Sequence, residues 1–383
     1  MLIVIADDFT GAAELGGVGL RFGLNVEIQT EFDVNSNAEL LVIDTDSRSD
    51  SPALAVKKVE RLASQIHEMG EVWIYKKTDS VLRGNVRIEL QTLRKIFDQK
   101  TVLLIPANPS FGRTISNGKY FIRDTPLHQT DFANDPEHPI KSSDVMQLLG
   151  ASADMDIRCI HTGEPIPKCE IAIGETENQD HLIKWAYQTH TKILPAGGSE
   201  FFYVLLRTMG MSPLQKDTSI EFLTDSTTLI VCGSASEYSR KTIAQTRKNG
   251  KAVYDMPAEL FTLNNDEREY LIRWTNDVVN AFQKNKKVIV AIIQPVVQHA
   301  DLSKKLAQNM AELVENVLRK IEVSELIIEG GATAAAVVHR LNWKIFHPFQ
   351  EITPGVVRMQ VAENPKLHLT IKPGSYVWHE KIF

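Results

Sequence analysis

The sequence predicts an α/β protein of two domains, each with a mostly parallel sheet flanked by helices. Short apolar runs recur without polar alternation, as in strands that are covered on both faces. Segments with helical spacing separate these runs, and such alternation is typical of a parallel sheet with right-handed crossovers. The alternation stops at a polar stretch past the middle of the 383-residue chain and then restarts. Two separate sheets follow from this interruption.

The first half of the chain contains the clearest alternation. Its expected central strands are residues 2–5, 40–43, 72–75 and 102–105. Its expected helices are residues 11–22, 52–69, 87–97, 142–149 and 182–190, with a further strand at 193–196 and a helix ending at 206. Residues 108–139 are rich in Pro, Gly, Asn and Asp and lack periodicity. A long irregular segment within a compact domain is more often functional than idle.

The alternation restarts beyond residue 227. The polar stretch 210–227, which includes Pro213 and Asp217, is the best candidate for a linker. After it we expect strands at 229–232, 288–293 and 325–328, and helices at 238–249, 302–321 and 334–341. The predicted boundaries are a first domain at 1–215, a linker at 216–226 and a second domain at 227–383. We expect the active site in the cleft between the two domains.

Charge and cysteine content limit the classes of partner. The 42 Lys and Arg residues against 48 Asp and Glu residues give a net charge of −6, which disfavours nucleic-acid binding because such proteins usually carry a basic face. The three cysteines form no CxxC pair, so neither a disulfide framework nor a structural zinc site is expected. The apolar start ends at Ala6, and no run approaches the roughly 20 residues of a membrane span. We expect a cytoplasmic protein without a membrane partner, and the sequence leaves formation of a homo-oligomer open.

Two carboxylates follow the first expected strand. Asp7 and Asp8 precede the helix expected from Gly11, and ligands of open α/β sheets gather at the carboxyl ends of the strands. Two acids there can orient a substrate hydroxyl or accept its proton. An Asp that merely caps the helix is the common alternative, but capping explains only one of the two acids. We therefore favour a functional role for the pair.

Polar loops also follow the third and fourth expected strands. The first of these loops contains Lys77, Asp79, Arg83 and Asn85 around a glycine turn. The second contains Arg113, and Arg binds carboxylates in a bidentate fork. A solvated charged loop and an ordinary rigid loop are the alternatives. Three polar loops after three strands of one sheet favour a shared anion-binding site.

Two strand-to-helix turns in the second domain have the composition of phosphate-binding loops. One contains Ser234 and Ser236, and the other contains Gly330, Gly331, Ala332 and Thr333. Exposed amides at a helix start, next to small residues, bind phosphate. Each turn alone is equally consistent with an ordinary connection, but two in one small domain favour a nucleotide. Gly355 and Gly374 lie in Pro-Gly turns that would border the nucleotide or merely reverse the chain.

Several common motifs are missing from the sequence. It contains no P-loop and no GxGxxG, so a dinucleotide oxidoreductase is poorly supported. It contains neither the HExxH metal spacing nor the GxSxG nucleophile turn. The sequence therefore identifies no metal ligands.

The motifs that are present, in this order, resemble the four-carbon acid sugar kinase family. The resemblance rests on ADDFTGA at 6–12, KTDSVLRGN at 77–85, residues 106–114, GSAS at 233–236, GGAT at 330–333 and KPG at 372–374. Members of that family join a sugar-acid-binding domain to a nucleotide-binding domain and use ATP to phosphorylate acids such as threonate, erythronate and 3-oxo-tetronates. The resemblance implies that Asp8, Asp79, Arg83 and Arg113 lie at the acid, and that Ser234 or Ser236, residues 330–333 and Gly374 surround ATP.

The chain departs from the family's pattern at three places. Ala235 stands where the family commonly has Cys, and Ala332 stands where it has an acid. Residues 375–378 replace a Phe-Gly pair. These departures bear on Mg²⁺ or ribose contacts and on the exact substrate.

The expected function is therefore an ATP- and Mg²⁺-dependent kinase that acts on a small anionic sugar acid. One of Asp8 and Asp79 would accept or orient the hydroxyl proton, since phosphoryl transfer needs mostly positioning and charge neutralisation. The expected contacts to the acid are Asp7, Lys77, Arg83, Asn85 and Arg113. One alternative is a non-catalytic sensor of a sugar acid or nucleotide. Another is an aldolase or dehydratase, which would leave the phosphate-binding turns unexplained.

Overall fold

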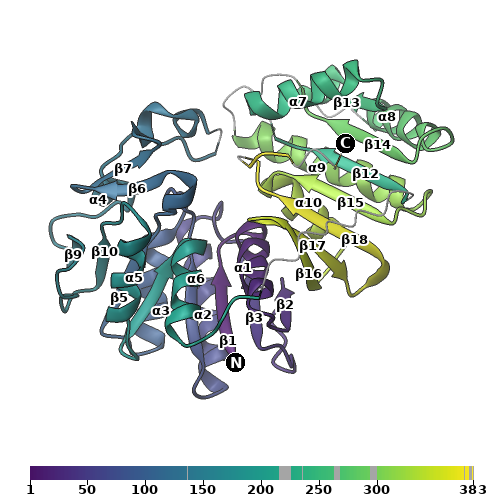
Figure 1. Ribbon diagram of the computed structural model, residues 1–383. Helices are drawn as coiled ribbons and strands as arrows, with labels where there is room; N and C mark the ends of the chain where they lie inside the picture. The colour runs from purple at the N-terminus through teal and green to yellow at the C-terminus, as the bar shows by residue number, and fades with distance from the viewer. Residues whose placement is uncertain are drawn as a thin grey trace. The chain divides into compact units, whose positions relative to one another are not determined.

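The chain divides into two compact units, Met1–Gln215 (unit 1) and Lys216–Phe383 (unit 2), each built on its own set of strands (Figure 1). The computed structural model describes residues 1–135, 137–214, 226–234, 236–262, 268–293, 300–374, 376–378 and 382. The linker expected at 216–226 lies, apart from Ser226, outside these residues.

Unit 1 is a parallel sheet flanked by helices, as predicted. Its strand order is β2-β3-β1-β4-β11-β5-β10-β9, and all of these pairings are parallel. The strands are β1 (Leu2–Ala6), β2 (Val26–Gln29), β3 (Leu40–Asp44), β4 (Trp73–Lys77), β5 (Thr101–Ile105), β9 (Ile157–Ile160), β10 (Ile171–Gly174) and β11 (Ile193–Gly197). The helices are α1 (Phe9–Arg21), α2 (Pro52–Glu68), α3 (Val86–Ile96), α4 (Val145–Leu148), α5 (Gln179–Gln188) and α6 (Ser199–Thr208).

Local sequence explains these elements. Strands β3 and β5 are buried at every residue, which is why their sequences show no alternation. Helix α2 begins with proline in its first turn, where the missing N–H is not needed, and it buries one apolar stripe that includes Val59 and Ile66. Strands β2, β9 and β10 have only four residues each, too few for the sequence pattern to separate them from loops.

The segment after β5 is more regular than the sequence suggests. It contains η1 (Pro109–Phe111), a three-stranded antiparallel sheet of β6 (Arg113–Ser116), β7 (Lys119–Ile122) and β8 (Thr125–Pro126), and the turns η2 (Leu127–Gln129) and η3 (Asp131–Asn134). Asn117 and Gly118 connect β6 to β7 with φ angles of 49° and 69°. An Asn-Gly pair is a strong hairpin signal, so this turn was readable from the sequence.

Unit 2 combines a parallel and an antiparallel part. The strand order is β13-β14-β12-β15-β18-β17-β16, parallel as far as β18 and antiparallel from there to β16. The strands are β12 (Thr228–Cys232), β13 (Val253–Asp255), β14 (Lys287–Ala291), β15 (Glu325–Glu329), β16 (Ile345–Thr353), β17 (Val356–Val361) and β18 (Asn364–Lys372). The helices are α7 (Glu237–Lys248), α8 (Arg268–Ala281), α9 (Ala300–Leu318) and α10 (Gly331–Arg340), with η4 (Ala258–Phe261). Sequence reasoning found the turns around β16–β18 but not the strands.

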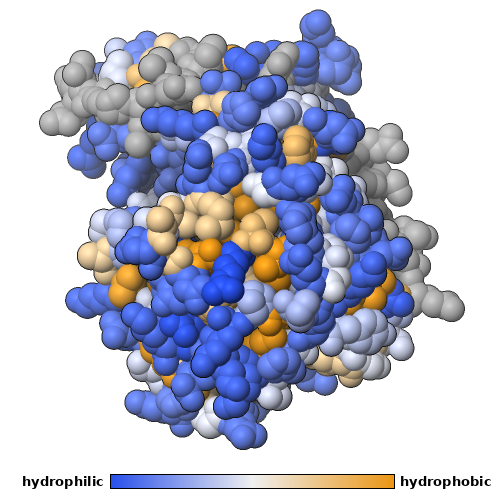
Figure 2. Space-filling model, turned by 90° about the vertical axis from the view of Figure 1, so that its left-hand side faces the viewer, coloured by the Kyte–Doolittle hydropathy of each residue, from blue (hydrophilic) through white to orange (hydrophobic). Residues whose placement is uncertain are grey.

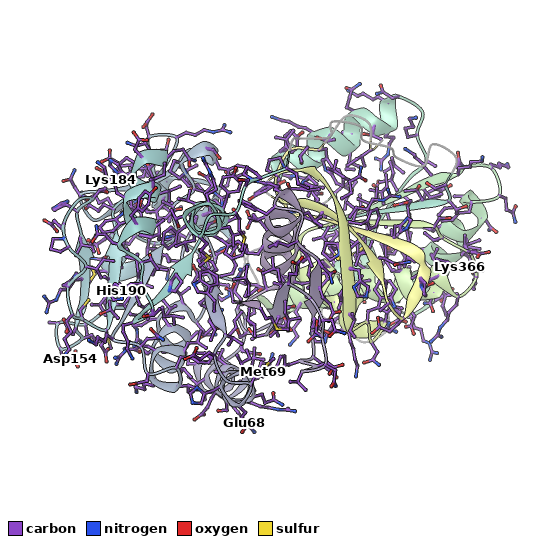
Figure 3. All side chains as sticks on the ribbon, turned by 60° about the horizontal axis from the view of Figure 1, so that its bottom comes forward. Glu68, Met69, Asp154, Lys184, His190 and Lys366 are labelled. Carbon is purple, nitrogen blue, oxygen red and sulfur yellow. The ribbon has the colours of Figure 1, made fainter. Side chains whose placement is uncertain are left out.

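The surface carries the ordinary charged side chains of a folded protein. Figure 2 shows apolar side chains gathered within a mostly hydrophilic face. Asp154, Lys184 and Lys366 lie at the periphery in Figure 3 and are exposed. The three cysteines are free. Among the described residues, no helix is both long and apolar enough to cross a membrane.

Candidate active site

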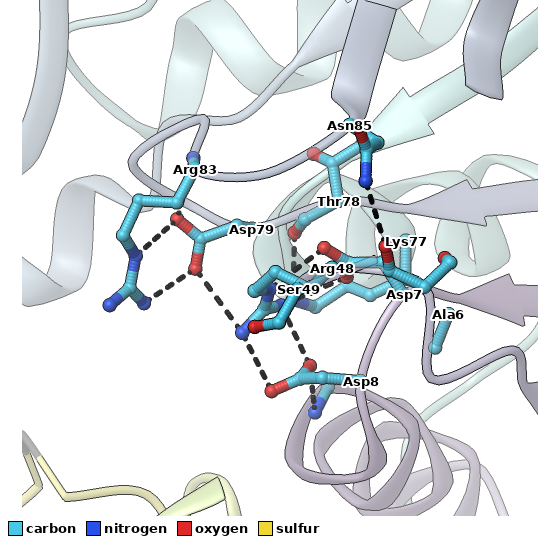
Figure 4. A network of polar contacts seen from close by, with 12 residues as sticks. Ala6, Asp7, Asp8, Arg48, Ser49, Lys77, Thr78, Asp79, Arg83 and Asn85 are labelled. Atoms are coloured by element: carbon cyan, nitrogen blue, oxygen red, sulfur yellow. Dashed lines mark hydrogen bonds and ion pairs between the residues drawn. The ribbon is translucent and has the colours of Figure 1, made fainter. Parts of the chain in front are cut away.

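Arg48 joins three carboxylates at the carboxyl edge of the unit 1 sheet (Figure 4). It lies in the loop after β3 and donates to both oxygens of Asp7, over 2.8 and 2.9 Å, and to both oxygens of Asp8, over 2.7 and 2.8 Å. An Asp79 oxygen lies 3.6 Å from the same guanidinium. Because the Arg48 side chain is only 16% exposed, water screens these charges weakly. Arg48 therefore binds acids from the loops after β1 and β4, which are neighbouring strands of the sheet.

Asp8 has a second role as the cap of helix α1. Its Oδ1 accepts from the Gly11 N–H over 2.9 Å, and its Oδ2 accepts from the Thr10 hydroxyl. This is the usual contact of an N-cap carboxylate. Asp8 thus caps the helix, as the alternative interpretation expects, and also binds Arg48, as Asp7 does. The Asp8 side chain is 15% exposed, against 2% for Asp7 and 5% for Asp79, so Asp8 is the most accessible of the three acids.

Asp79 and Arg83 form a bidentate pair within one loop. Arg83 donates from Nε and Nη2 to the two oxygens of Asp79, over 2.9 and 2.8 Å, and from Nη1 to Asp135 over 2.6 Å. The backbone N–H groups of Val81 and Arg83 also donate to Asp79. Both oxygens of Asp79 are therefore occupied, and two carboxylates balance the charge of Arg83.

These cations hold Asp7 and Asp79 in the ionised form. Burial disfavours the charge of Asp79, but Arg83 and Arg48 outweigh burial and hold the pKa of this carboxyl far below its usual range. Burial is likewise outweighed at Asp7, where Arg48 and Lys76 lower the pKa. Carboxyls of such low pKa are weak proton acceptors at neutral pH. Asp7 and Asp79 therefore act as fixed charges within this network.

Gly84 and Asn85 hold the loop that carries Arg48. Gly84 has a φ of 82°, and a Cβ added there would lie 2.8 Å from both Cγ and the carbonyl oxygen of Arg48. The Asn85 amide donates to the carbonyls of Ser47 and Asp50, each over 2.9 Å. The glycine turn recognised in the sequence thus positions a residue from another loop.

Lys77 lies beside the first turns of α1. Its Nζ is 3.3 Å from Glu14 and donates to the Thr78 carbonyl over 3.0 Å. A Cβ on Gly11 would lie 3.4 Å from this Nζ but only 2.6 Å from Oδ1 of Asp8, so the glycine leaves room for the Asp8 carboxylate. Glu14 also accepts from the Ser199 hydroxyl over 2.8 Å, which connects Lys77 to the start of α6.

Arg113 joins the same edge from the first position of β6. Its guanidinium donates to the Ser80 hydroxyl, in the loop that also carries Asp79 and Arg83.

Three residues of this network, Arg48, Asp135 and Glu14, were not predicted from the sequence. A usable signal existed for Arg48, because it follows a central strand just as Asp7 and Asp79 do. None existed for Asp135, whose place depends on the path of a long loop.

Three turns of unit 2 meet at the carboxyl ends of β12, β15 and β18. The register pairs Cys232 with Glu329 and Glu329 with Lys372, so the three strands end side by side. A Cβ on Gly374 would lie 3.0 Å from the Ser234 hydroxyl. Gly330, the N-cap of α10, has a φ of 102°, and a Cβ on it would lie 3.6 Å from the Ser234 nitrogen. Ser234, Gly330 and Gly374 are therefore neighbours.

The remaining predicted residues of unit 2 surround these turns. Ser236 caps α7 by accepting from the Ser239 N–H over 3.2 Å. Thr333 is buried with its hydroxyl against Gly233, where a Cβ would lie only 2.0 Å away. Ala332 is exposed at the start of α10, next to Gly331, and Ala235 lies outside the described residues. Gly355 has a φ of 79° and packs against the ring of Tyr376.

The turns that contain Ser234, Gly330 and Gly374, here called the cradle, lie next to a buried ion pair. Lys372 donates to Glu329 over 2.7 Å and to the Pro373 carbonyl over 3.0 Å, and both charged side chains are fully buried. The Ser239 hydroxyl, in the first turn of α7, also donates to Glu329. Burial raises the pKa of Glu329 and lowers that of Lys372, and each partner's charge opposes the shift of the other. The pair connects the ends of β15 and β18 to α7.

No cluster for a resident metal ion is evident in the part of the chain that the structure describes. Within those ranges, no group of three or more His, Cys, Asp or Glu residues has the arrangement of a metal site. Magnesium in phosphoryl-transfer enzymes is commonly held by substrate phosphates and only one or two carboxylates. The small residues and positive-φ glycine of unit 2 suit the close approach of phosphates to the backbone.

Two family models match the chain, one in each unit. The family described as sugar-binding N-terminal domain matches residues 2–193, and the nucleotide-binding C-terminal domain matches residues 229–376. A 3-oxo-tetronate kinase of Haemophilus influenzae is 25% identical and covers 98% of this chain and 97% of its own. A D-threonate kinase of Salmonella typhimurium is 24% identical, covering 92% and 89%. A crystal structure from Haemophilus influenzae has the same fold, with a TM-score of 0.68 at 23% identity, covering 98% of this chain and 97% of that one. The chain belongs to the four-carbon acid sugar kinase family.

Proposed function

We propose that this protein is an ATP-dependent kinase that phosphorylates a hydroxyl of a four-carbon sugar acid, of the threonate, erythronate or 3-oxo-tetronate type. One observation carries the proposal: each unit gathers most of its predicted site residues at the carboxyl ends of its parallel strands. Unit 1 offers charged side chains there, and unit 2 offers glycine and serine turns. The kinase names of two relatives that align along nearly their whole length support the same reaction.

Asp8 is the proposed acceptor or orienting group for the substrate hydroxyl. It is the most accessible of the three acids around Arg48. The pKa of Asp79 is strongly lowered and its carboxylate forms a bidentate pair with Arg83, so its proposed role is to fix the position of Arg83. The proposed role of Asp7 is to hold Arg48.

Arg113, Arg83 and Lys77 are the proposed contacts to the carboxylate of the acid. Arg113 donates to the Ser80 hydroxyl, in the loop that also carries Asp79 and Arg83. Arg83 keeps its position through Asp79 and Asp135 and offers its remaining N–H groups. The Asn85 amide binds two loop carbonyls, so its proposed contribution is to the shape of the site.

The proposed nucleotide contacts are the backbone N–H groups and hydroxyls around Ser234, Ser236, residues 330–333 and Gly374, with Gly355 at their border. Amides at the starts of α7 and α10 suit phosphate oxygens through hydrogen bonds and the helix dipole. Mg²⁺ would arrive with the phosphates and neutralise their charge. This chain's own part is to bind and orient both substrates.

A screen for ADP release tests the proposal. The wild-type chain is incubated with Mg²⁺-ATP and, in turn, with threonate, erythronate and their 2- and 3-oxo forms, each as separate stereoisomers. We expect ADP and a phosphorylated acid in equal amounts with at least one of them. Binding of ATP and acid without phosphorylated product would favour the sensor, and conversion of the acid without nucleotide would favour the aldolase or dehydratase.

A further inference from the structure

We propose that Phe132 is a positioning residue that holds both Arg83 and Arg113 in place for one substrate carboxylate. The inference rests on the proposed function and adds to it a residue from outside the strand-end motifs. Phe132 lies in the turn η3. The Arg83 Cζ atom is 5.2 Å from the centre of its ring, and the Arg113 Cζ atom is 5.8 Å from it.

Both distances are within the range of a cation–π interaction, about 6 Å from the ring centre. Two guanidinium groups that contact one ring repel each other, and Asp79 and Asp135 weaken this repulsion by balancing the charge of Arg83. The negative face of an aromatic ring attracts both groups without neutralising either of them. Asp79 and Asp135, in contrast, attract Arg83 at the cost of balancing its charge. A ring is therefore suited to hold cations in place for an incoming anion.

The ring itself has a defined position. Phe132 is partly buried and packs against the core of unit 1. Its carbonyl accepts from the Ile140 N–H over 3.0 Å, which closes the loop. Asp135, three residues on, binds Arg83 and accepts from the His138 N–H over 2.8 Å. The loop thus contacts Arg83 at two points and Arg113 at one.

Kinetics of three variants test the role of the ring. Phe132→Leu keeps an apolar side chain but removes the ring, and Phe132→Tyr keeps the ring. We expect F132L to raise the KM for the acid about tenfold, the scale of two partly exposed cation–π contacts. The kcat and the KM for ATP should stay within about twofold, and F132Y should restore the acid KM. The matched control is Phe97→Leu, because Phe97 packs partly buried against the same core but lies against His67.

A double-mutant cycle with Arg113→Met separates positioning of Arg113 by the ring from a general loss of order in the loop. If the ring acts through Arg113, F132L should raise the acid KM less in the R113M background than in the wild type. Equal effects in the two backgrounds, or an unchanged acid KM in F132L, overturn the inference while the kinase function stands.

Calorimetric titration with the acid distinguishes failure of the proposed kinase function from failure of the proposed role of Phe132. If the wild-type chain binds the acid but forms no product, the kinase proposal fails, and weaker binding by F132L than by F97L still supports the role of Phe132. If the wild-type chain neither binds nor phosphorylates any of the acids, both proposals fail.

Discussion

The carboxyl edges of the two sheets use different chemical groups. In unit 1 the edge is made of charged side chains, with Arg48 and Arg83 bound to four carboxylates. In unit 2 the edge is made of glycine and serine turns above a single buried ion pair. Side chains can be matched to the hydroxyls and carboxylate of one acid, whereas backbone amides suit the phosphates shared by all nucleotides. Under the proposed function, this difference assigns selectivity for the acid to unit 1.

The largest expected effect comes from removing the accessible acid of unit 1. Asp8→Asn keeps an N-cap for α1 but cannot accept a proton, so we expect kcat to fall about 10³-fold, the scale of general base catalysis. ATP affinity, measured by calorimetry, should be unchanged because the substitution lies in unit 1. Asp98→Asn, at an exposed position after α3, is the control and should retain wild-type turnover. Near-normal turnover in D8N would remove Asp8 from the mechanism.

Arg48→Met should have the largest effect on stability. It leaves three carboxylates without their shared cation, and we expect the free energy of unfolding at pH 7 to fall by about 3 kcal/mol in urea titrations. The control is Arg273→Met, which breaks an exposed ion pair with Glu269 and should lower the free energy of unfolding by less than about 0.5 kcal/mol. If both variants lose the same small amount, the charged edge of unit 1 has no structural importance.

The loss of folding stability caused by R48M should also depend on pH. Arg48 helps to lower the pKa of Asp7 and Asp79 in the folded chain, against the effect of burial. A lowered folded pKa contributes stability above the unfolded value, near 3.8, and this contribution is lost as the pH falls below it. The difference in stability between the wild type and R48M should therefore narrow as the pH is lowered from 7 towards 3. A difference that stays constant or widens would contradict this electrostatic account.

In unit 2, Lys372→Met should affect the nucleotide and not the acid. It leaves the Glu329 carboxylate buried without its cation beneath the cradle, and we expect the KM for ATP to rise about tenfold. Lys366→Met is a close control because it lies on the same strand, β18, and breaks only an exposed pair with Glu322. A rise in the acid KM that matches the rise in the ATP KM would mean that the two edges are not separate in their tasks.

The smallest expected effect is that of a single methyl group in the cradle. In Gly374→Ala the new Cβ would lie 3.0 Å from the Ser234 hydroxyl, a tight contact that a small movement relieves. We expect the KM for ATP to rise about threefold, with the acid KM as an internal control, and a larger rise in Gly374→Val. An ATP KM that is unchanged even in the Val variant would place the nucleotide away from this turn.

Local sequence determined most of the central strands and the motifs at their ends. Continuous apolar runs identified β1, β3, β4, β5, β12 and β15, because strands covered on both faces need no polar positions. The strand-end motifs followed, since carboxyl ends of parallel strands share one edge. The assignment of Asp7, Asp8, Asp79, Arg83 and Arg113 to one sheet edge needed no more than this rule. The roles of these residues remain predictions.

Tertiary structure decided which of these charges bind each other. Arg48 is some 40 residues from Asp7 in sequence, and only the parallel pairing of β1 with β3 brings their loops together. Phe132 meets Arg83 through the path of a long loop, and Glu329 meets Lys372 through the register of β15 with β18. Local patterns record burial and backbone conformation, which each short segment fixes by itself. Pairing of distant charges depends on strand order and register, which no short segment contains.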